Sequence, residues 1–260
     1  LSKIYRQAES SHIILNAHKI NAGELITLDN KNRDFFFFEK RDVRSVMGAL
    51  VYLVKDRLPE YIGASPFEIQ VLTPMRKGEL GVEHLNEVLQ YYLNPASESK
   101  KEKEGRTGIF REGDKVMQIK NNYKLEWKIT NAKGFSVEEG LGVFNGDMGI
   151  IKQINTYSER ITVVFDENRE VEYPFSSLDE LELAYAITIH KSQGSEYPAV
   201  VLPLLSGPPI LCNRNLLYTA ITRAQKCVAI VGRQSMVEQM IHNETEQKRY
   251  SGLNDCLREG

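Results

Sequence analysis

Three short apolar runs near the C-terminal end constrain the fold more than any other feature of this chain. They occupy residues 186–189, 199–202 and 228–231, and each is flanked by polar or turn-forming residues. Continuous apolar runs of this length are typical of strands buried on both faces, as in parallel sheets covered by helices. A polar loop separates the first two runs, and a predicted amphipathic helix separates the last two. The stretch therefore predicts the core of an α/β domain.

The N-terminal part of the chain extends this α/β pattern. Further apolar runs at 35–38 and 69–72 predict two more buried strands. Apolar residues also recur at helical spacing, which predicts helices at 11–22, 42–58, 82–93, 213–224 and 236–241. Pro59 is expected to end the second of these helices. Residues 97–106 are almost all charged or polar and predict a solvated loop.

A β-rich segment interrupts the α/β pattern. It contains short apolar runs punctuated by turn signals, among them Asn145-Gly146 and residues 166–168, and it predicts a small barrel or sandwich. Because it lies inside the pattern, we expect an inserted domain. The expected division of the chain is 1–110, 111–181 (with a core at about 143–178) and 182–260.

Composition argues against a strongly basic nucleic-acid-binding protein, a membrane protein and a disulfide-stabilised protein. The chain has 33 Lys and Arg against 35 Asp and Glu, so nucleic-acid binding would depend on local groups rather than on bulk charge. No apolar run approaches the roughly 20 residues of a membrane helix. The three cysteines fit neither a disulfide framework nor a metal site, and we expect a cytoplasmic protein without a metal site of its own. The chain opens on Leu1 without a signal-peptide pattern, so we expect a fragment.

The polar loop after residue 189 is the first candidate site. On a strand, Thr188 and His190 would share a face at its carboxyl end, where open α/β sheets bind ligands. The loop offers further cation, hydroxyl, amide and carboxylate groups, namely Lys191, Ser192, Gln193, Gly194, Ser195 and Glu196. Gly194 permits close backbone approach, and Glu196 could bind a ribose hydroxyl. An ordinary polar connection between two strands is the alternative interpretation.

Arg223 is the second candidate. On the predicted helix it would share a polar face with Thr219, Thr222 and Lys226. An arginine at a domain edge could reach developing phosphate charge, as an arginine finger does in phosphoryl transfer. The alternative is a surface arginine paired with a nearby carboxylate.

Six blocks, in order along nearly the whole chain, resemble the C-terminal half of the RecD-like helicases of superfamily 1. They are LSKIYRQA, QVLTPMRKGELGVEHLN, GDKVMQIKNNY, VFNGDMGII, AYAITIHKSQGSEYPAVVLPL and LLYTAITRAQKCVAIVG. The resemblance implies a RecA-like parallel sheet flanked by helices, with an inserted SH3-like β domain. It also implies an ATP-dependent DNA helicase that moves along single-stranded DNA in the 5′-to-3′ direction.

The same resemblance implies roles for individual residues. Arg6 and Arg223 are expected to act on the ATP γ-phosphate. The residues expected to line the nucleotide cleft are Gln193, Gly194 and Glu196. Those expected on the DNA track are Thr73, Asn145, Thr188, His190 and Lys191.

One part of a complete motor is missing from the sequence. No G-x-x-x-x-G-K-[ST] phosphate loop occurs, so we expect ATP and Mg²⁺ to be bound mainly by an absent N-terminal RecA-like domain. This chain alone is expected to be inactive. Residues 161–168 mimic a magnesium-binding strand, but their place in the β-rich segment predicts a hairpin instead.

Single-stranded or forked DNA and the N-terminal domain are the expected partners. Two alternatives stay open. The chain could be a stand-alone module that binds single-stranded DNA or protein, or it could be the helicase part of a nuclease or relaxase assembly.

Overall fold

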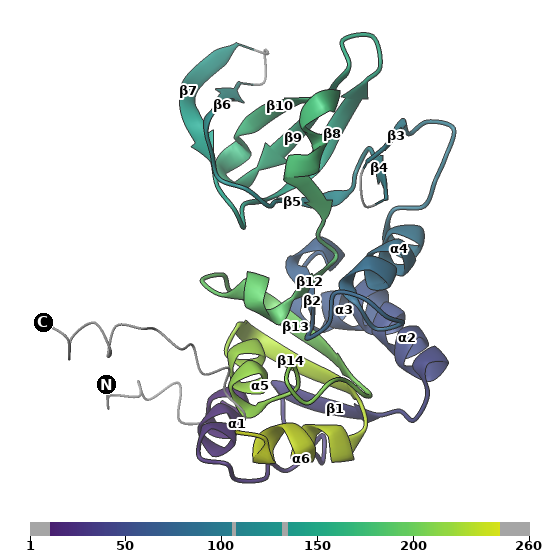
Figure 1. Cartoon of the computed structure of the whole chain (residues 1–260), viewed down its shortest axis with the longest axis vertical. Helices are drawn as coiled ribbons and strands as arrows, with labels where there is room; N and C mark the ends of the chain where they lie inside the picture. Colours follow the sequence, from purple (N-terminus) through teal and green to yellow (C-terminus); the bar gives the residue numbers. More distant parts are fainter. Residues whose placement is uncertain (1–10, 106–107, 132–134, 245–260) are drawn as a thin grey trace, which may run out of the picture.

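Figure 1 shows the computed structural model, which describes residues 11–105, 108–131 and 135–244. A five-stranded parallel sheet with its helices forms the lower body, and a seven-stranded antiparallel sheet forms the upper one. The prediction of a parallel sheet flanked by helices, with a separate β-rich segment, is confirmed. No helix among the described residues is long and apolar enough to span a membrane.

The parallel sheet has the strand order β1-β14-β13-β2-β12. Its strands are β1 (Phe35–Glu39), β2 (Ile69–Thr73), β12 (Ala186–Thr188), β13 (Tyr197–Leu204) and β14 (Ala224–Gly232). Alternate side chains enter two different apolar clusters: Val228 and Ile230 of β14 pack on one face, and Ala229 and Val231 pack on the other. The sheet is thus buried on both faces, which explains the continuous apolar runs.

Six α-helices among the described residues cover the two faces. They are α1 (His12–Asn21), α2 (Val43–Tyr52), α3 (Leu58–Ile62), α4 (Val82–Leu93), α5 (Arg214–Ile221) and α6 (Gln234–His242). Helices α1, α5 and α6 contribute to one cluster, and α2, α3 and α4 contribute to the other. Pro59 does not end the second predicted helix. A π-helical turn over Leu53–Arg57 leads into α3, whose first turn holds Pro59 and does not need the missing N–H.

The antiparallel sheet has the order β11-β5-β8-β9-β10-β6-β7. Its strands are β5 (Lys115–Gln118), β6 (Asn122–Thr130), β7 (Ser136–Val143), β8 (Met148–Asn155), β9 (Arg160–Phe165), β10 (Glu170–Pro174) and β11 (Leu181–Leu183). Strands β9 and β10 pair antiparallel across a 3₁₀ turn at Asp166–Asn168. The hairpin predicted for residues 161–168 is therefore confirmed.

The charged segment at 97–106 is largely solvent-exposed over its described residues, as predicted, but the prediction of a loop is wrong for Glu102–Glu104, which form a strand. Strand β3 (Glu102–Glu104) pairs antiparallel with β4 (Ile109–Arg111). The Nε atom of Arg111 donates to Oε1 of Glu102 at 2.6 Å. Cross-strand pairing of opposite charges thus orders a segment that has few apolar groups.

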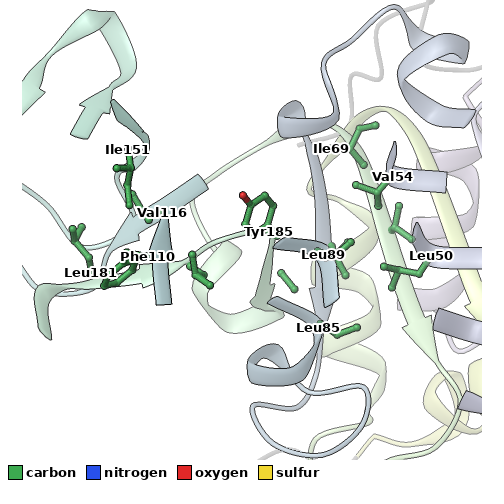
Figure 2. Packing of buried hydrophobic residues seen from close by; sticks show 14 of the residues in the cluster. Leu50, Val54, Ile69, Leu85, Leu89, Phe110, Val116, Ile151, Leu181 and Tyr185 are labelled. Carbon is green, nitrogen blue, oxygen red and sulfur yellow. The ribbon is translucent and has the colours of Figure 1, made fainter. Parts of the chain in front are cut away.

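The two sheets meet at a shared core. Figure 2 shows Tyr185 between the apolar side chains of the antiparallel sheet, such as Val116 and Ile151, and those of α4, such as Leu89. The Tyr185 hydroxyl donates to the fully buried carboxylate of Asp114 at 2.9 Å. That carboxylate also accepts hydrogen bonds from Gln90 Nε2, Asn94 Nδ2 and the Arg111 backbone N–H. Apolar packing and a satisfied polar network therefore fix the junction between the sheets.

Candidate functional site

Most of the predicted site residues lie at the ends of the parallel strands, one group at the carboxyl ends (the carboxyl edge of the sheet) and the other at the amino ends (the amino edge). Thr188 at the end of β12 pairs with Thr73 at the end of β2, whereas Ala199 of β13 pairs with Ile69. These two levels are four residues apart on β2, or about 13 Å at the rise of a β-strand. The connection from β12 to β13 therefore runs back along the sheet and joins its carboxyl edge to its amino edge.

The carboxyl edge brings Thr73 and Thr188 side by side. Thr73 is fully buried, and its hydroxyl donates to the Leu80 carbonyl at 2.7 Å. The Thr188 hydroxyl accepts from the Lys191 backbone N–H at 3.3 Å and caps the following 3₁₀ turn. Both threonine hydroxyls thus form hydrogen bonds with backbone groups of the segments that follow their strands.

The strand predicted over 186–189 ends earlier than expected. It stops at Thr188, and Ile189–Ser192 form a 3₁₀ turn closed by a hydrogen bond of 2.6 Å from Ser192 Oγ to the Ile189 carbonyl. His190 is exposed on this turn. The prediction that Thr188 and His190 share a strand face is therefore wrong, because the side-chain cap at Thr188 ends the strand first.

Lys191 lies in an ion cluster at the same edge. Its Nζ atom donates to Oε2 of Glu182 at 2.9 Å, and Nη2 of Arg76 donates to Oε1 of the same carboxylate at 2.5 Å. Arg76 follows β2, Glu182 belongs to β11, and Lys191 follows β12. The carboxyl edge thus presents two cations around one carboxylate.

The second half of the polar loop lies at the amino edge, which corrects our expectation that the whole loop sits at the carboxyl ends of strands. Gln193, Gly194 and Glu196 are exposed, and Gly194 has a φ of 90° with no atom within 4 Å of an added Cβ. Glu196 accepts a hydrogen bond from Gln225 Nε2 at 3.2 Å. Glu196 precedes β13, so its position follows from the direction of that strand.

Arg223 lies at the same amino edge, directly before β14. Helix α5 ends at Ile221, so Arg223 and Lys226 are not on it and the prediction of a shared helical face is wrong. The Tyr197 N–H donates to the Arg223 carbonyl at 2.8 Å, which brings this residue into the start of the β13–β14 pairing. Sheet pairing therefore takes precedence over helix propensity here.

The Arg223 guanidinium contacts only neutral oxygens among the described residues. Nη1 donates to the Ser195 carbonyl at 3.1 Å, Nε to the Thr219 carbonyl at 3.3 Å, and Nη2 to Thr222 Oγ1 at 3.4 Å. It forms no ion pair with a carboxylate in the described part of the chain. The guanidinium is thus held in place by hydrogen bonds, and the alternative of an arginine paired with a nearby carboxylate is not observed among the described residues.

Two predicted residues lie apart from these edges. Asn145 is exposed on the turn between β7 and β8, where its backbone N–H donates to Asn121 Oδ1 at 2.9 Å. Arg6 lies outside the described residues. No group of three or more His, Cys, Asp or Glu residues within 11–105, 108–131 and 135–244 could hold a metal ion.

Sequence reasoning missed Arg76 and Glu182 as members of the site. The two residues are 106 positions apart in the chain, and the hydrogen bond between them forms only when β11 packs beside the loop after β2. Glu182 lies between two buried leucines, where a local pattern gives no sign of an ion pair.

Two family models match the chain. The SH3 domain of ATP-dependent RecD-like DNA helicases matches residues 85–165, and the UvrD-like helicase C-terminal domain matches residues 183–231. These matches confirm the SH3-like insertion and the resemblance described from the sequence.

Curated relatives agree with these matches. The ATP-dependent RecD2 DNA helicase of Deinococcus radiodurans is 35% identical over 225 residues, which are 86% of this chain and 27% of that protein. The RecBCD enzyme subunit RecD of Mycolicibacterium smegmatis is 30% identical over 191 residues, which are 74% of this chain and 29% of that protein. The chain therefore spans less than a third of the length of either relative.

A solved structure supports the same fold. The Bacteroides Pif1 helicase, in complex with ADP-AlF3 and single-stranded DNA, superposes with a TM-score of 0.51 at 20% sequence identity. The match covers 100% of this chain and 56% of that one. At this identity the likeness concerns the fold alone.

Proposed function

Since this chain carries the SH3 domain of RecD-like DNA helicases and a UvrD-like helicase C-terminal domain, we propose that it is the C-terminal motor half of an ATP-dependent DNA helicase. The complete protein would translocate on single-stranded DNA, with the 5′-to-3′ polarity that the family resemblance implies. The division into residues 1–110, 111–181 and 182–260 belongs to this proposal, as does a cytoplasmic location. The run of antiparallel strands from Lys115 to Leu183 supports the division.

The environment of Arg223 is the observation that carries the proposal. Three neutral oxygens hold its guanidinium at the sheet edge, and no carboxylate of the described residues pairs with it. A guanidinium held in this way retains donors and its full charge for an anionic ligand. A phosphate group of a nucleotide bound by a neighbouring domain fits this requirement.

The nucleotide's own chemistry is transfer of the γ-phosphoryl group, assisted by Mg²⁺. In this chain, Arg223 would stabilise negative charge at the amino edge. Gln193, Gly194 and Glu196 would line the cleft beside it. Arg6 would approach from the N-terminal segment, as the resemblance implies.

The carboxyl edge is the proposed DNA track. Thr188 and Lys191 are partly exposed there, and His190 is exposed on the adjoining turn. The fully buried Thr73 would shape the track from beneath, through its hydrogen bond to the Leu80 carbonyl. Exposed cations and hydroxyls are the groups that contact a nucleic-acid backbone. Asn145 would contact DNA from the antiparallel domain rather than from this edge.

The connection from Thr188 to Tyr197 would couple the two edges. It begins beside the proposed track and ends beside Arg223, more than about 13 Å further along the sheet. A shift of the amino edge when a neighbouring domain closes on ATP would therefore move the same short segment that borders the DNA. Nucleotide-driven closure would change the grip on the strand in this way.

One relative is named as a subunit of the RecBCD enzyme, so a helicase role within a larger enzyme is a second candidate. Upstream sequence separates it from a self-contained motor. Assembly with further subunits would leave the roles of the two edges unchanged.

Replacement of Arg223 by alanine tests the proposal. In the complete protein, Arg223→Ala is expected to lower single-strand-stimulated ATP hydrolysis by about 10³-fold or more, the range found for arginine fingers. Binding of a fluorescent ATP analogue should be largely preserved. The control is Arg160→Ala, which removes an exposed arginine of β9 in the antiparallel sheet, away from both edges of the parallel sheet. Hydrolysis by Arg223→Ala at the rate of the control would refute the assignment.

A further inference from the structure

Arg76, Glu182 and Lys191 form an ion cluster at the carboxyl edge of the parallel sheet. Glu182 of β11 binds Arg76 at 2.5 Å and Lys191 at 2.9 Å. The cluster therefore joins the antiparallel domain to the loops that follow two neighbouring parallel strands. It lies beside Thr73 and Thr188, where the DNA track is proposed.

The three side chains of the cluster differ in how deeply they are buried. The Glu182 side chain is only 11% exposed, whereas Arg76 is 44% exposed and Lys191 is 28% exposed. Glu182 takes one of the three Nζ protons of Lys191, so this ammonium retains donors for a ligand. A ligand arriving from solvent thus meets two cations with the Glu182 carboxylate beneath them and the exposed Glu83 carboxylate at the side of Arg76.

The electrostatics agree with this layering. Burial alone would raise the pKa of the Glu182 carboxyl, but the hydrogen bonds and charges of Arg76 and Lys191 outweigh burial and hold this pKa below its ordinary value. Glu182 is therefore ionised at neutral pH, and the three groups together carry a charge of about +1. Glu83, which lies 3.5 Å from Arg76, is 42% exposed and solvent-screened.

We propose that Glu182 is a positioning residue of the DNA track. It holds Arg76 and Lys191 toward one backbone phosphate of the bound strand and offsets part of their charge, so that the strand is held but can be released at each step. The inference rests on the proposed function, because it assigns the ligand of this edge as single-stranded DNA. Arg76 thereby becomes a further DNA-contacting residue.

The affinity of the cluster for a phosphate should depend on salt concentration in proportion to its net charge. Glu182→Gln keeps the shape of the side chain and changes the charge of the cluster from about +1 to about +2. One additional uncompensated charge on a single strand steepens the slope of log affinity against log salt by about 0.7. Glu182→Gln should therefore bind the strand several-fold more tightly than the wild-type protein at about 50 mM salt. The ratio of the two affinities should fall by a factor of about 2.6 between about 50 mM and about 200 mM salt.

The test uses the complete protein and a fluorescein-labelled oligothymidylate, with anisotropy measured over this salt range. Glu182→Gln is expected to bind more tightly and with the steeper slope. Glu182→Gln combined with Lys191→Met returns the cluster to about +1 and should restore the wild-type slope. Glu60→Gln, which removes an exposed carboxylate of α3, is the matched control and should leave the slope unchanged.

A purely structural role for Glu182 gives a different result. Glu182→Gln would then bind DNA with the wild-type slope or more weakly, and either outcome overturns the proposal. If this variant fails to fold, Arg76→Met is measured instead with Glu182 intact. Removal of one cation from the phosphate contact should make the slope shallower by about 0.7, and an unchanged slope would overturn the proposal. Absence of DNA binding by the wild-type protein would instead refute the proposed function.

Discussion

Lys115 places a titratable group inside the junction between the two sheets, and its pH dependence can be worked out. The residue is 6% exposed, and its Nζ atom donates to the Phe67 carbonyl at 2.6 Å and to Gln70 Oε1 at 2.9 Å. Both acceptors are neutral. Burial lowers the pKa of Lys115 from 10.5 to about 7, against the weaker opposing charges of Asp166 and Glu68.

The sign of the effect follows from proton linkage. The unfolded chain keeps the Lys115 proton up to about pH 10, whereas the folded chain releases it near pH 7. The unfolded state therefore binds more protons over this interval, and the free energy of unfolding rises with pH. With half of Lys115 protonated in the folded state at pH 7, the gain between about pH 7 and pH 9 is about 2 kcal/mol.

Lys115→Met removes this titration. Urea unfolding of the chain, followed by fluorescence of its single tryptophan, Trp127 on β6, measures the free energy of unfolding at several pH values. The wild-type value should rise by about 2 kcal/mol more than that of Lys115→Met between about pH 7 and pH 9. Packing changes caused by methionine do not enter, because they are the same at each pH. Lys124→Met, at an exposed position, should keep the wild-type pH dependence. Equal pH dependence in wild type and Lys115→Met would refute the reasoning.

Two further predictions concern stability and are checked by chemical unfolding. A Cβ at Gly232, where φ is 155°, would lie 1.8 Å from the Leu204 carbonyl oxygen, so Gly232→Ala should destabilise the fold by about 3 kcal/mol or more. Gly48 lies inside α2, and a Cβ added there would have no atom within 4 Å, so Gly48→Ala should stabilise the fold by about 0.5–1 kcal/mol. Equal changes in the free energy of unfolding for the two variants would contradict this reasoning. Asp114→Ala removes the acceptor shared by Tyr185 and the other junction donors and should cost roughly 3 kcal/mol or more through buried unsatisfied groups. A loss below about 1 kcal/mol would show that this network contributes little.

The fold could be predicted because burial determines both the residue types and their order. The quadruple phenylalanine at 35–38 lies on β1, and the runs at 69–72 and 228–231 lie on β2 and β14. Strands with both faces covered need apolar residues at every position, so their sequences are distinctive. The ends of the helices and strands depended instead on side-chain caps and on strand pairing. Both involve contacts between residues that a sequence pattern does not contain.

The candidate site was harder to predict for the same reason. Gly194 and Arg223 could be singled out by their local sequence, but their place at the amino edge depends on the direction of β13 and β14. Glu182 and Lys115 gave no local signal, because each meets its partners across the junction between the sheets. Charged residues in such positions are identified only when distant segments are brought together.

The way the antiparallel domain is attached has a consequence for how such chains can vary in length. Strand β5, which opens the domain, pairs with β11, which closes it, with Val116 opposite Leu183. The chain therefore leaves and rejoins the parallel body through two neighbouring, hydrogen-bonded strands, which form the stem of the antiparallel domain. Their pairing fixes the distance between the two ends of the intervening segment. Residues added to the distant β6–β7 hairpin do not change the separation of the two stem strands, and longer loops add little closure entropy. The hairpin can lengthen or shorten between related proteins while the two edges of the parallel sheet keep their geometry.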